Sequence, residues 1–184
     1  MQTPTTLIAP IDGLEFLQEY RNKWLQRPSA ILPPHMSVCP EFVSSRSLGQ
    51  GELDRLSAAT EMVEPFRVYF DRTKQHLEAN ILYLMPEAVD ELAKLSEALH
   101  KAFLTELRLH SHRPFHLTLG MFGSSAELAA AEAQFWENLG SGKRLCGQVT
   151  KLELYERAGE SWKRRCAFDL LGRKPTAEAP DLAA

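Results

Sequence analysis

The sequence lacks the features of a secreted, membrane-spanning or nucleic-acid-coating protein. It has only three cysteines, an odd number without CxxC spacing, so we expect no disulfide framework and a reducing cytoplasmic location. The longest apolar run, residues 81–85, is far too short to cross a bilayer, and the N-terminus shows no signal-peptide pattern, so no membrane partner is expected. The formal net charge of −3 argues against a broad basic surface, although it leaves room for a local basic groove.

The chain is long enough, at 184 residues, for one domain with a sizeable core or for two small lobes. Apolar residues recur with both period-two and helical spacing. Strands are expected at residues 5–11, 35–43, 66–71, 81–85, 115–122, 149–157 and 162–171, and helices at 14–25, 52–64, 87–107 and 126–139. This order falls into two halves, so we predict a two-lobed α+β domain over residues 1–171 and a loose, Pro- and Ala-rich tail over 172–184.

A short motif, His-x-Ser/Thr, occurs once in each half of the chain. His35 with Ser37 forms the first pair, and His116 with Thr118 forms the second. Side chains alternate across a strand, so each histidine shares a face with its hydroxyl residue and the apolar neighbours share the opposite face. One such pair is commonly an exposed strand edge whose hydroxyl bonds locally. Two pairs, each preceded by a proline within two residues, favour a joint functional role.

These residue types suit chemistry on a phosphodiester. Imidazole titrates near neutral pH, so one histidine can act as a general base while the other acts as a general acid. The two hydroxyl groups can donate hydrogen bonds to the nonbridging oxygens, where negative charge builds in the transition state. The set requires neither a metal nor another cofactor. It therefore predicts the opening, or the formation, of a cyclic phosphate.

At these residues the chain resembles the two-histidine (2H) phosphoesterase superfamily, which includes the 2′-5′ RNA ligase-like proteins and cyclic nucleotide phosphodiesterases. The family signature appears as HisMetSerVal at 35–38 and HisLeuThrLeu at 116–119, and the resemblance covers about residues 3–171. It implies a duplicated two-lobed α+β fold, with an antiparallel sheet in each lobe, flanking helices and a central cleft. It also implies metal-free hydrolysis of 2′,3′-cyclic or 1″,2″-cyclic phosphates, or reversible 2′-5′ joining of RNA.

Carried over residue by residue, the resemblance makes His35 and His116 the acid/base pair. It also implies that Ser37 and Thr118 bind the phosphate. Which histidine is the acid stays open at this point. The sequence departs from the pattern in two places. Serine replaces the commoner threonine of the first motif, and Gly-Met-Phe at 120–122 stands where some members have a basic residue. The second departure weakens the case for tight binding of an RNA end.

Two aromatic residues are candidates for stacking on a nucleobase. Phe122 has the same strand parity as His116 and Thr118, and Tyr69 lies on the face opposite Phe66 and Phe70. Core packing of Phe122 explains the pattern equally well.

A histidine-rich segment precedes the second motif. His110 and His112 could ligate a metal together with His116, but Pro114 interrupts the run, and no nearby Cys, Asp or Glu supplies a further ligand. We therefore predict a solvated loop and no metal site.

We predict a monomeric, metal-independent cyclic phosphodiesterase whose substrate is a nucleotide or RNA end carrying a cyclic phosphate. Two alternatives remain open from the sequence. One is an RNA 2′-5′ ligase, which needs a groove for two RNA ends. The other is a phosphate- or nucleotide-binding module that has the same pocket but no turnover.

Overall fold

The computed structural model describes residues 3–25, 32–103, 114–140 and 142–173. The strands are β1 (Thr5–Pro10), β2 (His35–Cys39), β3 (Phe66–His76), β4 (Ile81–Pro86), β5 (Leu117–Met121), β6 (Leu145–Val149), β7 (Lys151–Ala158) and β8 (Ser161–Asp169). The α-helices are α1 (Leu17–Trp24), α2 (Gln50–Glu61), α3 (Asp90–Ala102) and α4 (Ser125–Leu139), and short 3₁₀ turns occupy Ser45–Ser47 and Leu77–Ala79. No helix within these ranges is long and apolar enough to cross a membrane.

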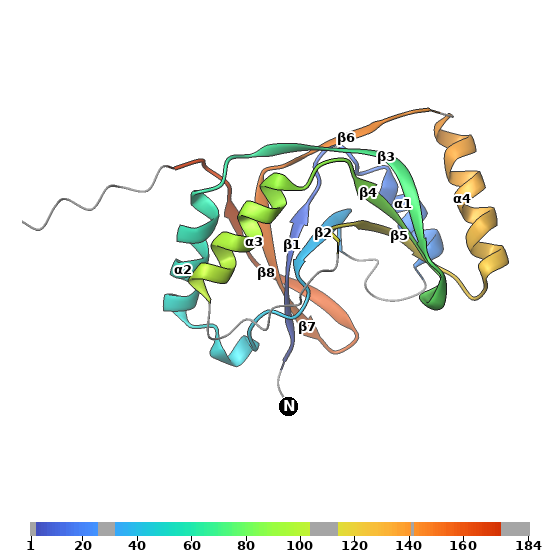
Figure 1. Ribbon diagram of the computed structural model, residues 1–184. Helices are drawn as coiled ribbons and strands as arrows, with labels where there is room; N and C mark the ends of the chain where they lie inside the picture. Colours follow the sequence, from blue (N-terminus) through green and yellow to red (C-terminus); the bar gives the residue numbers. More distant parts are fainter. Residues whose placement is uncertain (1–2, 26–31, 104–113, 141, 174–184) are drawn as a thin grey trace, which may run out of the picture.

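The strands form two four-stranded antiparallel sheets (Figure 1). The first has the order β2-β1-β7-β8, and the second has the order β5-β4-β3-β6. This two-lobed α+β architecture confirms the predicted fold class. The two strands that bear the histidine motifs, β2 and β5, are edge strands of different sheets, and they lie side by side at the centre of the molecule (Figure 1).

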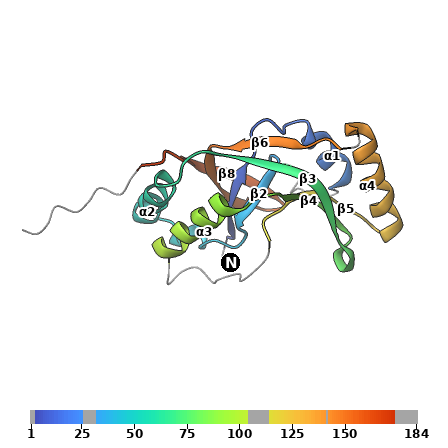
Figure 2. The same ribbon diagram turned by 45° about the horizontal axis from the view of Figure 1, so that its top comes forward.

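Two of the helices, α1 and α3, pack on the other sheet from the one whose strand precedes them in the chain. Helix α1 follows β1 of the first sheet but packs on β5 of the second, whereas α2 and α3 pack beside β8 and β2 of the first sheet. Helix α4 lies on the second sheet with α1 (Figures 1 and 2). Both halves of the chain therefore contribute to both lobes.

One continuous core holds the two lobes together. Strand β1 is buried along its whole length, and α3 buries a stripe of three leucines at helical spacing. The same hydrophobic cluster contains Leu7 and Met36 from the first sheet and Leu82 and Leu117 from the second. Because β2 and β5 both bury their apolar faces in this cluster, the position of each histidine strand depends on the other.

Several predicted boundaries are wrong. Strand β3 extends to His76 rather than ending at residue 71. Val149 ends the unpredicted strand β6, which pairs with β3 in the second sheet, and only Thr150 separates it from β7 in the first. Strand β2 ends at Cys39 instead of residue 43, and β5 begins one residue after His116.

The predicted tail begins with two residues that contact the domain. The backbone N–H groups of Gly172 and Arg173 donate to the carbonyl oxygens of Val63 and Glu61, at 3.0 and 2.8 Å. Residues 174–184 lie outside the described part of the chain.

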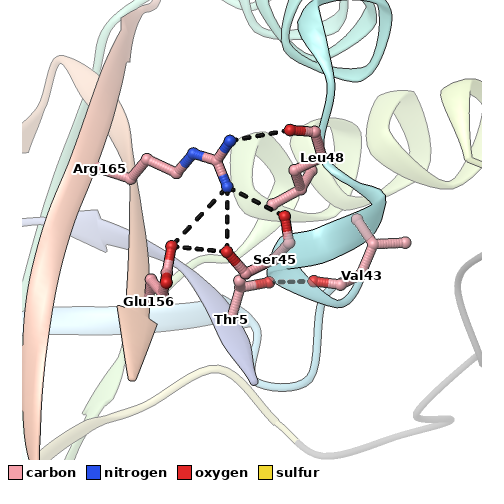
Figure 3. A network of polar contacts seen from close by, with 6 residues as sticks. All are labelled: Thr5, Val43, Ser45, Leu48, Glu156 and Arg165. Atoms are coloured by element: carbon pink, nitrogen blue, oxygen red, sulfur yellow. Dashed lines mark hydrogen bonds and ion pairs between the residues drawn. The ribbon is translucent and has the colours of Figure 1, made fainter. Parts of the chain in front are cut away.

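A polar network fixes the loop that follows β2 (Figure 3). The Thr5 hydroxyl donates to the carbonyl oxygen of Val43 at 2.5 Å, and the Ser45 hydroxyl donates to Glu156 at 2.6 Å. Arg165 donates to the Ser45 carbonyl at 3.2 Å and to the Leu48 carbonyl at 2.8 Å (Figure 3). The network thus anchors the far end of the first histidine strand to β1, β7 and β8.

Candidate active site

The four residues of the two His-x-Ser/Thr motifs lie on the adjoining edges of the two sheets. His35 and Ser37 belong to β2, Thr118 belongs to β5, and His116 immediately precedes β5. All four are half-buried, whereas Met36 and Leu117, which separate the two members of each pair, are fully buried. The alternation predicted from the sequence is therefore present, with the apolar side chains in the core and the polar ones on the other face of each strand.

The two imidazoles are held by the same local hydrogen bond. Nδ1 of His35 lies 2.7 Å from the carbonyl oxygen of Pro33, and Nδ1 of His116 lies 2.8 Å from that of Pro114. A carbonyl oxygen only accepts, so each Nδ1 carries the proton and donates it. In the neutral ring, Nε2 then keeps its lone pair and is the nitrogen available for proton exchange. The proline two residues before each histidine thus selects the tautomer.

The environment of His35 strongly favours its neutral form. Burial is the main cause that lowers the pKa of His35 to about 3; the charges of Arg21 and His116 act in the same direction, while the bond to the Pro33 carbonyl opposes them. At neutral pH, His35 is therefore able to accept a proton through Nε2.

A tyrosine that the sequence analysis did not single out lies against the second histidine. The ring centroids of Tyr83 and His116 are 4.9 Å apart, with 53° between the planes. Tyr83 pairs with Thr118 on β5 and with Lys74 on β3, so these three side chains share one face of the second sheet. The apolar run around Tyr83 predicted only a central strand, because its neighbours in the sheet are fixed by long-range register.

Arg21 is the second unpredicted residue. It lies on the buried face of α1, is 2% exposed, and donates through Nη1 to the carbonyl oxygen of Thr118. The sequence carried one signal, since Arg21 stands four residues after Leu17 and three before Trp24, within the apolar stripe of the helix.

The two candidate stacking residues have protein partners. The ring of Phe122 packs against Trp24, with centroids 5.8 Å apart, and both line a hollow of about 530 Å³ between α1, α4 and the end of β5. Tyr69 pairs with Cys146 of β6, and the guanidinium of Arg144 lies over its ring at 3.9 Å. Base stacking by either residue stays a prediction.

The structure describes only part of the histidine-rich segment that was considered as a metal site. Within the described ranges, no three His, Cys, Asp or Glu side chains group together as metal ligands. His110 and His112 of the histidine-rich segment lie outside those ranges.

The site thus combines two imidazoles with available Nε2 atoms, two hydroxyl groups and a buried guanidinium. A bound anion placed between the histidines could receive hydrogen bonds from the hydroxyls, while one ring removes a proton on one side and the other supplies a proton on the other. This is the chemistry required to exchange an ester bond at phosphorus.

Comparison with known proteins agrees with this chemistry. The family model described as the 2′-5′ RNA ligase superfamily matches residues 9–161, a range that includes both histidine motifs. A Bacillus mycoides (strain KBAB4) protein with the provisional name phosphoesterase is 30% identical over 101 residues, which are 54% of this chain and 58% of that protein. A similarly named Bacillus anthracis (strain A0248) protein is 28% identical over 101 residues, with the same coverage of both chains. The matches therefore span less than two thirds of these relatives.

Solved structures share the fold at low sequence identity. E. coli LigT complexed with 3′-AMP has a TM-score of 0.61 and 14% identity, over 92% of this chain and 99% of LigT. The structure of TT0787 from Thermus thermophilus also has a TM-score of 0.61 and 14% identity, over 93% of this chain and 100% of TT0787.

Proposed function

The chain belongs to the 2′-5′ RNA ligase superfamily, and from that premise we propose that it is a metal-independent phosphodiesterase that opens a cyclic phosphate on a nucleotide or RNA end. Family membership supports a phosphoesterase or ligase-type activity. The observation that carries the finer proposal is the matched pair of histidines on β2 and β5, each with Nδ1 on a proline carbonyl and Nε2 available. The LigT structures with 3′-AMP, NADP⁺ and ATP support a nucleotide as the substrate class.

In the proposed reaction, water attacks the phosphorus of a 2′,3′-cyclic or 1″,2″-cyclic phosphate. His35 accepts the proton of the attacking water through Nε2, because burial and Arg21 keep this ring neutral. The bond between phosphorus and one ribose oxygen breaks, and His116, in its doubly protonated imidazolium form, gives that oxygen the proton on Nε2. The product is a ring-opened phosphomonoester, and proton exchange with solvent restores the two rings.

The two hydroxyl groups have a separate task. Ser37 and Thr118 donate hydrogen bonds to the nonbridging oxygens and stabilise the charge that develops on them. Among the described residues, neither hydroxyl is engaged in a hydrogen bond with another side chain or carbonyl. The substitutions Ser37→Ala and Thr118→Val would then lower the reaction rate without disturbing the fold.

The decisive experiment measures product from nucleoside 2′,3′-cyclic phosphates, ADP-ribose 1″,2″-cyclic phosphate and RNA with a cyclic end, each with and without EDTA. Activity should survive EDTA and fall at least about 10²-fold in His35→Ala and in His116→Ala. His76→Ala is a matched control, since His76 is exposed at the end of β3. A His35→Ala enzyme as active as the parent would refute the mechanism.

The same samples separate the alternative functions. Thermal stabilisation by nucleotide without any product would indicate a binding module. RNA joining, with binding that falls steeply as salt rises, would indicate a ligase.

A further inference from the structure

Arg21 is a buried cation without a carboxylate partner in the described part of the chain. It is one of the largest fully buried side chains of the protein, at 2% exposure. The ion pairs recorded among the described residues do not include it, and its Nε has no hydrogen-bond partner there. Burial lowers the pKa of Arg21 to about 10, so the guanidinium remains charged at neutral pH.

A buried arginine without a carboxylate partner is not expected to stabilise the fold by itself. A buried charge loses its hydration, and carbonyl oxygens compensate it less fully than a carboxylate does. Replacing buried charges with apolar side chains of similar volume often leaves a protein as stable as before, or more so. The position of Arg21 therefore calls for an explanation beyond packing.

The carbonyl groups that Arg21 contacts belong to the two histidine segments. Nη1 donates to the carbonyl oxygen of Thr118 on β5, and Nη2 donates at 3.4 Å to that of Leu32, just before Pro33. The next carbonyl, that of Pro33, accepts from the ring of His35. One guanidinium thus joins the backbone at both motifs, across the junction of the two sheets.

The charge of Arg21 also acts on the site. It is the second cause, after burial, of the lowered pKa of His35, and the remaining charged group that acts on this ring is His116. An anion bound between the histidines would lie within the same positive field. No acidic side chain in the described residues competes with that anion for Arg21.

We propose that Arg21 is a positioning residue of the phosphate site: it ties the strands of His35 and Thr118 together, and its counterion is the phosphate group itself. This inference rests on the proposed function and adds a third element to the acid, base and hydroxyl set. The guanidinium is too buried to touch the substrate, so it acts through the Thr118 backbone and through its field.

The test compares Arg21→Met, Arg21→Gln and Arg21→Lys with the parent protein, using inorganic phosphate as the probe. Calorimetry should show phosphate binding weakened at least about tenfold in Arg21→Met and Arg21→Gln, and within about threefold of the parent in Arg21→Lys. Imidazole NMR should show His35 protonating at a pH higher by about half a unit or more in the two neutral variants, because a repelling charge has been removed.

Neither readout needs turnover, so the outcome is independent of whether a cyclic phosphate is hydrolysed. A purely structural role predicts lower thermal stability in all three variants, with unchanged phosphate affinity and unchanged His35 titration. That pattern would overturn the proposal. If Arg21→Met does not fold, Arg21→Gln still decides the question, because its amide can donate to the Thr118 carbonyl without carrying charge.

Discussion

The ring of Tyr83 lies against the imidazole of His116, with 4.9 Å between their centroids. No equivalent aromatic contact is recorded for His35 in the described residues, so the two halves of the site are not identical. Tyr83 is also the cross-strand neighbour of Thr118. One side chain thus borders both the histidine and the hydroxyl of the second motif.

Shortening Tyr83 should therefore impair the reaction. An aromatic pair contributes about 0.5–1.5 kcal/mol beyond its buried area, so losing it in Tyr83→Leu should lower kcat roughly three- to tenfold by freeing the imidazole. Tyr83→Phe keeps the ring and should stay within about twofold of the parent. Steady-state kinetics on a cyclic nucleotide measure both; an equal loss in Tyr83→Phe would assign the effect to the hydroxyl instead.

Lys74 supplies a cation that neither motif contains. It pairs with Tyr83, which pairs with Thr118, so Lys74 lies on the same face of the sheet, with its strand about 10 Å from β5. The second sheet thus offers one exposed cation on the face that carries Thr118, although residues 120–122 include no basic residue.

Lys74→Ala should raise KM for a dinucleotide or longer substrate roughly three- to tenfold, with little change in kcat, because an exposed charge aids binding rather than chemistry. The difference should shrink at high salt. Lys101→Ala is the matched control, since Lys101 is exposed on α3 and pairs with Glu97. A fall in kcat with constant KM would place Lys74 in the chemical step.

Local pattern predicts most of the elements and the histidine pairs. Alternation and helical spacing act over a few residues, and the burial of Leu82, Leu84, Leu92 and Leu95 follows directly from them. The repeated Pro-x-His spacing is visible in the sequence, but the hydrogen bond it makes is not, because that bond depends on backbone direction before the strand.

Pairing over long distances could not be predicted from the same pattern. The sequence pattern merges β6 with β7 because Thr150 alone separates them, yet they belong to different sheets. The contact of α1 with β5 joins residues 97 positions apart at Arg21 and Thr118. The roles of Arg21 and Tyr83 depend on that tertiary arrangement. The sequence alone could not reveal them, because it does not show which strands and helices pair with one another.

Gly120 controls how closely α1 approaches β5. A Cβ at this position would lie 2.5 Å from Cβ of Trp24 and 2.9 Å from the ring of Phe122. Trp24 Cβ is fixed to the helix, so Gly120→Ala must displace α1, and Arg21 moves with it. We expect a loss of about 1–3 kcal/mol in the free energy of unfolding and weaker phosphate binding.

Gly51→Ala provides the control for that substitution. Gly51 lies in α2 with open space around a Cβ, so alanine should raise the free energy of unfolding by about 0.5–1 kcal/mol and leave phosphate binding unchanged. Urea denaturation and calorimetry report the two quantities separately. Phosphate affinity that is unaffected in Gly120→Ala would show that the position of α1 does not matter to the site.

His35 should make the protein less stable as the pH falls. Its pKa is lowered in the folded state, to about 3, whereas in the unfolded chain it is near 6.5. Between these values the unfolded chain binds a proton that the folded protein excludes, so acidification favours unfolding, by at most about 1.4 kcal/mol per pH unit from this group. The contribution of neutral His35 is thus fully present above about pH 6.5 and is lost progressively as the pH falls toward 3.

His35→Gln tests this linkage because glutamine does not titrate and can still donate to the Pro33 carbonyl. Urea denaturation at pH 7.5, 6.0 and 5.0 should show the parent losing more stability than the variant at each step below pH 6.5. The carboxylates and the other histidines contribute equally to both curves, so the difference between the two curves isolates the effect of His35. Parallel curves would mean that His35 is as readily protonated in the folded protein as in the unfolded chain, and its assignment as the neutral base would fail with them.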